Sequence, residues 1–268
     1  MANIGILTAL LVYFGWVRSE EQSKRLGIDE SILGMSTQEY LLRSVRPVII
    51  LLLVIALSVV AWIVLDHAIS SRLERVGGVD GVYRWSIGVI FGVALLLPVL
   101  GWLARPLWPA LAYVAYPLLL AGSLLLILYG LHLRRALPGV AGISAQSENL
   151  LRAATAVLVA LGLFTTAANY AIVEGRQLAE EFPSQIQDLP RVVVHSVEPL
   201  HIDAPGTETS RAEQPEGFSY SYRGLRLLEH TGGRVFLISD GWTSEFGVVV
   251  VLPADDDGIR YDIVRDLR

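Results

Sequence analysis

The stretch PVIILLLVIALSVVAWIVL, residues 47–65, decides the fold of this chain. It contains no charged side chain, and a helix of about 20 apolar residues is long enough to cross about 30 Å of hydrocarbon. Three similar runs follow along the chain, at residues 85–104, 110–133 and 151–173. Together the four runs predict a helical membrane domain rather than the core of a soluble protein.

A shorter apolar run, residues 4–17, comes before these four. No basic residue precedes it and no small-residue cleavage site follows it, so it is not typical of a signal peptide. We interpret it as a retained, short first span, and the alternative is a re-entrant or interfacial segment. The sequence therefore predicts about five transmembrane helices within a domain of residues 1–175.

The chain changes character after Val173, where it becomes acidic and strand-like. Residues 1–174 carry 12 Lys and Arg against 10 Asp and Glu, whereas the remainder carries 9 against 16. Short β-branched and aromatic runs separated by turn residues predict a small all-β soluble domain over residues 176–268, either barrel-like or a sandwich. The expected strands are residues 191–197, 218–222, 225–230, 234–238, 248–252 and 259–264.

Turn signals and composition divide this tail further. The tripeptide Thr231-Gly232-Gly233 between two strand runs predicts a tight hairpin. Residues 203–217 are rich in Pro, Gly, Ser, Thr and Glu, a composition typical of a mobile loop. Upstream of the membrane runs, Ser36 and Glu39 have capping-box spacing, which predicts that a helix begins at Ser36 and continues into the span at residues 47–65.

Composition also argues against several classes of function. An acidic tail is unsuited to nucleic acid, whose phosphates require a basic surface. The chain has no cysteine and therefore no disulfide or thiolate metal site. The four long spans carry no Asp, Glu, Lys or Arg in their interiors, which argues against a proton-coupled pump. No nucleophile elbow, phosphate-binding loop or dinucleotide fingerprint is present, so we expect no enzymatic activity, no cofactor and no metal.

Polar residues on the last span are the candidate functional side chains. Thr165, Thr166 and Asn169 lie there, with Thr165 and Asn169 four residues apart and hence on one helix face. They are candidates for lining a pore or a ligand site. The alternative interpretation is interhelical hydrogen bonding, which such residues commonly supply in membranes. Pro98 and Pro117 interrupt two other spans, either as tolerated kinks or as markers of a binding site.

Orientation should follow from Lys and Arg in short loops, but these residues divide equally between the two sides. The pair Arg134-Arg135 lies directly at a span end, which favours a cytoplasmic position for its loop. Five spans would then place the N-terminus inside and the acidic tail outside the cell.

Two segments carry a resemblance to a known group. The first runs from Tyr13-Phe14-Gly15-Trp16-Val17-Arg18 through Gly27-Ile28-Asp29 to STQEYLLRS, residues 36–44, and the second is YRGLRLL, residues 222–228, with Trp242. In these segments the chain resembles uncharacterised polytopic membrane proteins of actinobacteria that end in a β domain. The resemblance implies a bacterial cell membrane and no particular activity.

The prediction is thus an integral membrane protein in a lipid bilayer. We expect a sensing or interaction module whose β domain recognises a protein partner or ligand, for example by adding a strand at an exposed sheet edge. The alternative is an oligomeric channel or small transporter, which would be a homo-oligomer. A membrane enzyme is the third hypothesis, and Asp66-His67 is the only pair that suggests one.

Overall fold

The computed structural model describes residues 2–75, 80–134, 145–211, 217–243 and 246–264. The chain forms two compact units, and each is described by itself. The helical unit is Ser44–Val173. The sheet unit combines both ends of the chain, Met1–Arg43 and Glu174–Arg268. Part of the loop predicted at 203–217, residues 212–216, and the loop at 135–144 that contains Arg135 lie outside the described residues.

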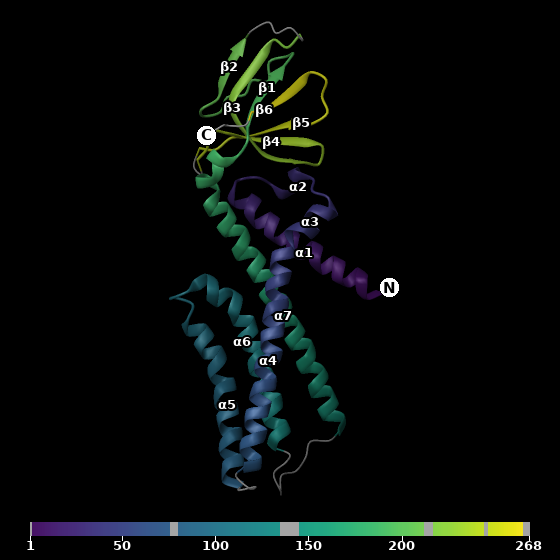
Figure 1. Ribbon diagram of the computed structural model, residues 1–268, viewed down its shortest axis with the longest axis vertical. Helices are drawn as coiled ribbons and strands as arrows, with labels where there is room; N and C mark the ends of the chain where they lie inside the picture. The colour runs from purple at the N-terminus through teal and green to yellow at the C-terminus, as the bar shows by residue number, and fades with distance from the viewer. Residues whose placement is uncertain (1, 76–79, 135–144, 212–216, 244–245, 265–268) are drawn as a thin grey trace. The chain divides into compact units, whose positions relative to one another are not determined.

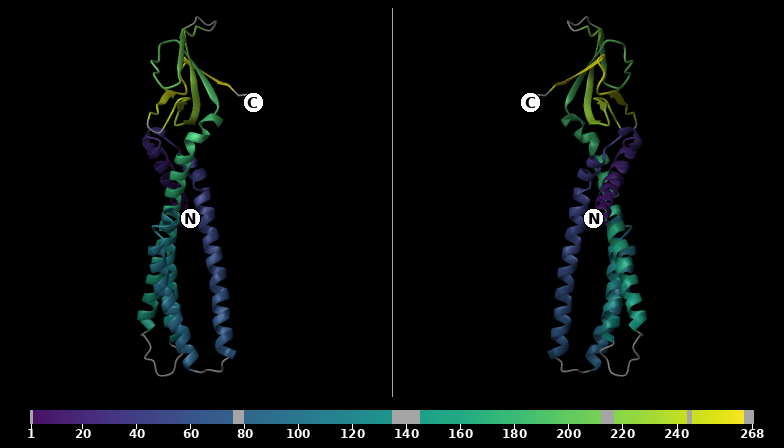
Figure 2. Two further views of the ribbon diagram at one scale, coloured as in Figure 1. Left: turned by 90° about the vertical axis from the view of Figure 1, so that its left-hand side faces the viewer. Right: turned by 90° about the vertical axis from the view of Figure 1, so that its right-hand side faces the viewer.

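The helical unit contains four long helices (Figure 1). They are α4 (Val45–Arg75), α5 (Asp80–Leu103), α6 (Pro109–Arg134) and the first part of α7 (Ala145–Gln185). By length and apolar composition each of these helices could cross a membrane. The short turn at residues 104–108 joins α5 and α6 into the antiparallel hairpin seen in Figures 1 and 2.

The expected count of about five spans is reduced to four among the described residues. Residues 4–17 form the first half of α1 (Ala2–Arg25), which belongs to the sheet unit. The physical reason is length, because only about 14 apolar residues precede the polar run from Arg18 to Arg25. That is shorter than the roughly 20 residues that a spanning helix needs.

Two prolines inside helices of this unit each free a backbone carbonyl, to which a side chain of a neighbouring helix then donates. A proline has no N–H, so it frees the carbonyl four residues before it in the helix. Pro98 frees the Ala94 carbonyl, which accepts a hydrogen bond from the Ser123 hydroxyl of α6 at 2.6 Å. Pro117 frees the Tyr113 carbonyl, which accepts one from the Asn169 amide of α7 at 2.7 Å. Both freed carbonyls are therefore satisfied by a neighbouring helix.

The sheet unit contains six antiparallel strands in the order β5-β4-β3-β1-β6, with β2 also paired to β3. Their bounds are β1 (Arg191–Ser196), β2 (Glu208–Arg211), β3 (Tyr220–Thr231), β4 (Arg234–Ser239), β5 (Val249–Pro253) and β6 (Ile259–Val264). The expected strands are present, but those at 218–222 and 225–230 form the single strand β3. Strand β2 lies inside the stretch expected to be a loop.

Gly224 explains why the sequence suggested a break in β3. It has φ of +80°, a conformation that costs an L-residue energy, and here it produces a bulge opposite β1. The bulge bends the strand without ending it. The predicted hairpin at Gly232-Gly233 is confirmed, because it joins β3 to β4 with positive φ at both glycines.

The sheet has a hydrophobic core on each face. Its inner face holds the main core, to which β1, β3 and β4 contribute buried residues and β5 and β6 partly buried ones. Its outer face packs against the end of α7 and the short helix η1 (Ile186–Asp188). The second core contains Phe182, Ile186, Ile238 and Trp242. Residues of α7 that follow the membrane-type run therefore serve the sheet unit.

Three N-terminal helices complete this unit: α1, α2 (Glu30–Leu33) and α3 (Thr37–Arg43). The predicted capping box is confirmed, since the Ser36 N–H donates to the Glu39 carboxylate and the Glu39 N–H donates to the Ser36 hydroxyl. The helix does not continue into the next span, however. Pro47 cannot bond to the Arg43 carbonyl, so α3 ends there, and the Arg18 guanidinium donates to that carbonyl at 3.0 Å.

Candidate recognition site in the sheet unit

The sheet is open between its two terminal strands, β5 and β6. Among the residues that the structure describes, β5 pairs with β4 alone and β6 with β1 alone. The two strands nevertheless share the inner core, and the Tyr261 hydroxyl of β6 donates to the Pro253 carbonyl of β5 at 2.6 Å. We call this opening the seam.

A pocket of about 230 Å³ lies at the seam. Its apolar wall comes from four strands and includes Val192, Leu227, Val235 and Ile263. His230 and Asp255 add an imidazole and a carboxylate to the lining. An apolar pocket with a few polar groups is the usual form of a small binding site.

Tyr261 lines this pocket, and its environment raises the pKa of its phenol. Burial, and secondarily the negative charge of Asp256, raise the pKa of Tyr261 to about 12. The phenol therefore stays neutral at physiological pH and acts as a hydrogen-bond donor to Pro253. Its hydroxyl fixes the spacing between the two strand ends.

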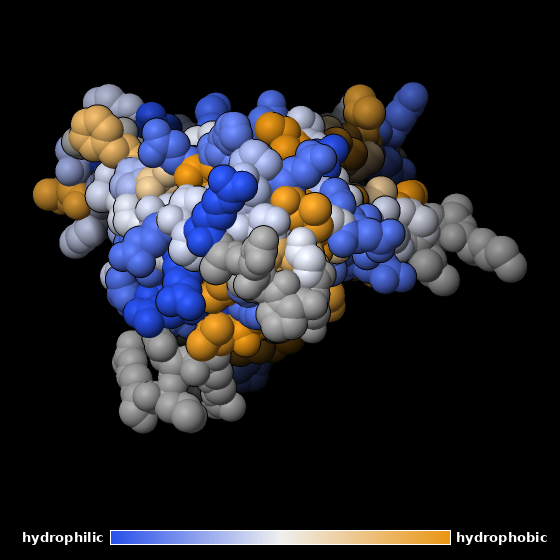
Figure 3. All heavy atoms as spheres, turned by 90° about the horizontal axis from the view of Figure 1, so that it is seen from above, coloured by the Kyte–Doolittle hydropathy of each residue, from blue (hydrophilic) through white to orange (hydrophobic). Residues whose placement is uncertain are grey.

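The free edge of the sheet at β6 is apolar on its last residues. Ile263 is 64% exposed and Val264 44% exposed. Seen from above, the surface combines hydrophilic residues with scattered hydrophobic ones (Figure 3). An unprotected edge strand offers backbone N–H and C=O groups to another extended chain.

Arg260 and Asp262, which flank Tyr261 on β6, belong to a small charged cluster. Asp262 lies 3.1 Å from the His195 imidazole and 3.1 Å from the Arg260 guanidinium. The Arg260 guanidinium also lies over the Phe218 ring, 5.3 Å from its centroid. Of these contacts, the one between His195 and Asp262 joins β1 to β6.

A buried arginine connects β3 to the end of α7. Arg226 is only 1% exposed, and its guanidinium is paired with Asp240. It also donates to the carbonyls of Gln187 and Leu189, at 2.8 and 3.0 Å, and to the Gln187 side chain at 2.9 Å. All three of its nitrogens are satisfied, so the charge is accommodated in the interior. Arg226 is the sequence neighbour of Leu227, which lines the seam pocket.

Two ion pairs and a glycine join α1 to α7. Arg18 pairs with Glu174 at 3.7 Å, and Arg176 donates to Glu21 at 2.7 Å. Gly175 lies between the two paired positions on α7. A Cβ there would lie 2.5 Å from the Arg18 carbonyl oxygen, so only glycine permits this approach.

The β3–β4 hairpin contacts the N-terminal segment as well. The Thr231 hydroxyl donates to Glu39 at 2.9 Å, and Arg43 is paired with Glu229. The turn itself approaches α2, because a Cβ on Gly232 would lie 2.8 Å from the Leu33 carbonyl oxygen. No pattern in the sequence pointed to these contacts, which join residues about 190 positions apart.

The residues predicted from the last span lie on α7 of the helical unit. Thr165 donates to Leu161 and Thr166 to Gly162, both within their own helix, at 2.9 and 2.8 Å. Asn169 donates to the Tyr113 carbonyl of α6. Of the three side chains, Asn169 makes the bond that the interhelical interpretation expects, whereas Thr165 and Thr166 bond within α7. Lining of a pore or ligand site by these three residues stays a prediction.

The remaining candidates have ordinary partners. The Asp66 carboxylate accepts a hydrogen bond from the Tyr129 hydroxyl at 2.7 Å. Among acidic residues that the sequence analysis did not single out, Asp256 accepts one from the Gly258 N–H at 2.8 Å, which is the geometry of a turn. Across the parts of the chain that the structure describes, His, Asp and Glu side chains form no group of three that could hold a metal ion.

Comparison with known proteins adds no template for this site. No protein-family model matches the chain, and no curated protein or solved structure is significantly similar to it.

Proposed function

We propose that this chain is a multi-pass membrane protein whose sheet unit recognises an extended segment of a protein partner at the seam. The helical unit supplies the anchor. The observation that carries the proposal is the unpaired edge of β6, with exposed Ile263 and Val264 beside the pocket that Leu227 and His230 line. An added strand would pair with the edge and place a side chain in the pocket.

The number of apolar helices supports the membrane part of this proposal. Four crossings return the chain to the side from which it started, as required if Met1–Arg43 and Glu174–Arg268 belong to one compact unit. A cytoplasmic loop at Arg134-Arg135 would place that unit outside the cytoplasm. In this arrangement α1 does not cross the bilayer, and its exposed Ile6, Leu7 and Trp16 suit the interfacial alternative.

The topology can be tested directly because the chain has no cysteine. Single cysteines at exposed Ser147 or Glu208 would be labelled in intact cells by a maleimide that cannot cross the membrane. The proposal expects labelling of the Glu208→Cys variant from outside, and of the Ser147→Cys variant only after permeabilisation. The proposal places an odd number of membrane crossings between residues 147 and 208. Labelling of both variants from the same side would contradict it.

A route from the seam towards the helices begins on β3. Leu227 lines the pocket, and its neighbour Arg226 binds the carbonyls of Gln187 and Leu189 just after α7. A partner that displaces Leu227 would therefore act on the arginine contacts to the segment just after α7. We propose this strand as the element through which binding is sensed.

The recognition step is tested by photocrosslinking in intact cells. A photoreactive amino acid at Ile263 should give a defined crosslinked product, whereas the same residue at exposed Glu208 on β2 should not. Replacement of Ala254 by Trp, which fills the pocket, should abolish the product from Ile263. Equal products from both positions, or none from Ile263, would rule out the seam as the recognition site.

An oligomeric channel or small transporter is the alternative function. It would require Thr165, Thr166 or Asn169 to face a polar path in an assembly of several chains. The hydrogen bonds of these residues to helix carbonyls lend it no particular support.

A further inference from the structure

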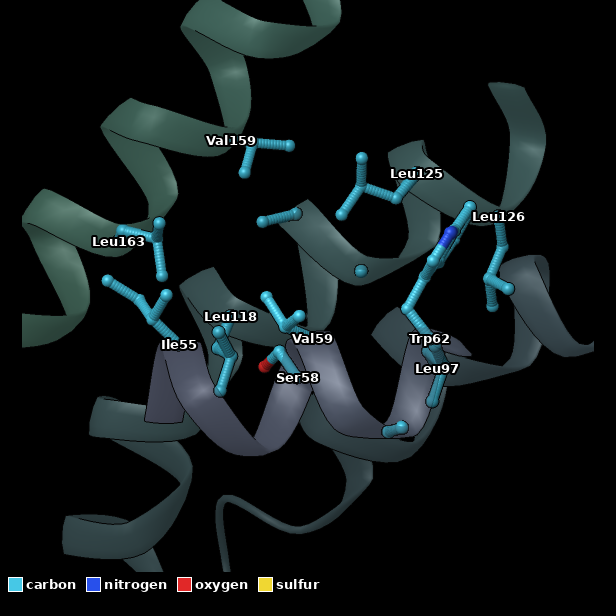
Figure 4. Close-up of a pocket in the computed structure, with 13 residues that line it drawn as sticks. Ile55, Ser58, Val59, Trp62, Leu97, Leu118, Leu125, Leu126, Val159 and Leu163 are labelled. Atoms are coloured by element: carbon cyan, nitrogen blue, oxygen red, sulfur yellow. The ribbon is translucent and has the colours of Figure 1, made fainter. Parts of the chain in front are cut away.

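The helical unit contains an apolar cavity of about 470 Å³ between α4 and α6, to which α5 and α7 each contribute a smaller part of the lining (Figure 4). On α4 the lining follows one helix face through Ile55, Ser58, Val59 and Trp62. These positions span about 10 Å along the helix axis. The cavity therefore extends along about two turns of α4.

The chemistry of the wall excludes water. Ser58 supplies the only hydroxyl among the thirteen lining residues, and it donates to the Val54 carbonyl of its own helix at 2.7 Å. The indole of Trp62 is the other polar group, and a buried water needs two to four polar partners. The space is also partly open to the surroundings of the helices, since Val59 on its wall is 53% exposed and Trp62 36% exposed. Hydrocarbon is the filling that meets both conditions.

The surroundings of α4 indicate where that hydrocarbon comes from. In the most apolar window of α4, 0% of the residues are buried, and Leu52, Leu53 and Val60 are each more than half exposed. In a bilayer these side chains would contact lipid. Val59 and Trp62 of the cavity wall are also exposed, so lipid chains next to α4 have a short path into the cavity.

An aromatic contact ties the two walls together beside the cavity. The rings of Trp62 and Tyr129 meet edge to face, with their centroids 5.0 Å apart. The Tyr129 hydroxyl donates to Asp66, one helix turn beyond Trp62 on α4. This contact keeps α4 and α6 joined at one point while the space next to it stays open.

We infer that the cavity binds one acyl chain of a membrane lipid, held between α4 and α6. The inference rests on the membrane insertion proposed above and is independent of recognition at the seam. The acyl chain would act as a packing element that the sequence itself does not supply, because α4 otherwise touches its neighbours at few points.

The test uses the full chain in phosphatidylcholine nanodiscs in which one acyl chain carries a photoactivatable diazirine. Crosslinked peptides are quantified by mass spectrometry. Gly122 lines the cavity, and a Cβ at this position would meet no atom within 4 Å. The Gly122→Leu variant should therefore fill the space and reduce labelling of peptides around residues 118–126 several-fold, with Gly122→Ala intermediate.

Gly92 provides the matched control, because it lies on α5, has equally open surroundings and does not line the cavity. Gly92→Leu should leave the labelling unchanged, and labelling at Leu52 and Leu53 should be constant in all variants. Equal labelling of the cavity in wild type and Gly122→Leu would overturn the inference. Recovery of a free apolar compound from an unlabelled cavity would also overturn the inference. Labelling confined to Leu52 and Leu53 would do the same. Absence of label from all of α4–α7 would instead contradict membrane insertion itself.

Discussion

At the scale of single residues, three prolines explain three otherwise unconnected polar contacts. Pro47, Pro98 and Pro117 each free the carbonyl four residues earlier, at Arg43, Ala94 and Tyr113. Each of these carbonyls accepts a hydrogen bond from a side chain of another helix, supplied in turn by Arg18, Ser123 and Asn169. The sequence showed the prolines and the polar residues separately, but the pairing depends on which helices are neighbours.

The pairing of Pro117 with Asn169 predicts a measurable coupling. Asn169→Leu should destabilise the helical unit by about 1 kcal/mol, because the Tyr113 carbonyl loses its partner in an apolar environment. In the Pro117→Ala background the backbone regains an N–H at this position that can bond to that carbonyl, so the same change should cost close to nothing. Unfolding in mixed micelles with increasing dodecyl sulfate measures both values.

Thr165 supplies the control for this cycle, because its hydroxyl bonds within α7. Thr165→Val and Pro117→Ala should have additive effects on the free energy of unfolding. Additivity of Asn169→Leu with Pro117→Ala would show that the two residues do not act through the Tyr113 carbonyl.

The second residue-scale prediction concerns Arg226. Arg226→Met should destabilise the sheet unit by roughly 3 kcal/mol, because it leaves Asp240 and the carbonyls of Gln187 and Leu189 without their donor. Arg223→Met, which replaces an exposed arginine on the same strand, should change stability by less than about 0.5 kcal/mol. Denaturant titration, monitored by the fluorescence of Trp242, would measure the difference in the free energy of unfolding. Similar values for the two variants would contradict a structural role for Arg226.

At the scale of elements, local signals predicted the long helices and most of the strands, since these depend on periodicity and turn residues. The capping box at Ser36 and the Gly-Gly hairpin are of the same kind. Strand β2 escaped prediction because Glu208–Arg211 is fully exposed and has no apolar alternation; only its pairing with β3 makes it a strand. The seam pocket was not predicted for a similar reason, because its apolar wall comes from four strands that only the tertiary structure brings together.

The β3–β4 turn allows an element-scale test with two adjacent glycines. Both have positive φ, which Asn tolerates better than most residues. Gly233→Asn should be nearly neutral, because a Cβ there meets nothing within 4 Å. Gly232→Asn should loosen α2 from the hairpin, because its Cβ would collide with the Leu33 carbonyl. Faster proteolysis of residues 26–36 in Gly232→Asn alone is the expected result, and equal rates would argue against this contact.

The capping box gives α3 a dependence on pH. The Ser36 N–H, and to a smaller extent the Thr231 hydroxyl, lower the pKa of Glu39 below its usual 4.5. Because the folded state favours the carboxylate, this stabilisation is complete well above pH 4.5 and is lost as pH falls through the lowered pKa. Glu39→Gln should therefore reduce thermal stability at about pH 7 more than at about pH 3. A loss of thermal stability in Glu39→Gln that is the same at both pH values would contradict this pH dependence.

At the scale of the whole molecule, the notable feature is that both ends of the chain build one unit. Composition divided the chain at about residue 175, because hydropathy changes there. The same division assigned residues 1–43 to the helical part. The local sequence of a helix does not show whether the helix packs on a distant hairpin or on its neighbours in the chain. The ion pairs of Arg18 and Glu21 with α7 depend on tertiary structure alone.

This arrangement predicts that the C-terminal segment is incomplete by itself. A protein of residues 174–268 would lack Leu26 from its outer core and the partners of Glu229 and Thr231. Joining residues 1–43 to it through a flexible linker should raise the unfolding temperature and slow proteolysis of the β3–β4 hairpin. Equal stability of the two proteins would mean that the N-terminal helices contribute little to the sheet unit.

The split unit also has a consequence during biosynthesis. Residues 1–43 leave the ribosome first, but their partners follow only after the 130 residues of Ser44–Val173 have been made. At usual rates of translation that is a delay of roughly 10 s. Throughout this interval Leu26 lacks the residues of α7 and the sheet against which it packs. The nascent N-terminus is therefore expected to depend on a chaperone or on the bilayer surface until the last strand emerges.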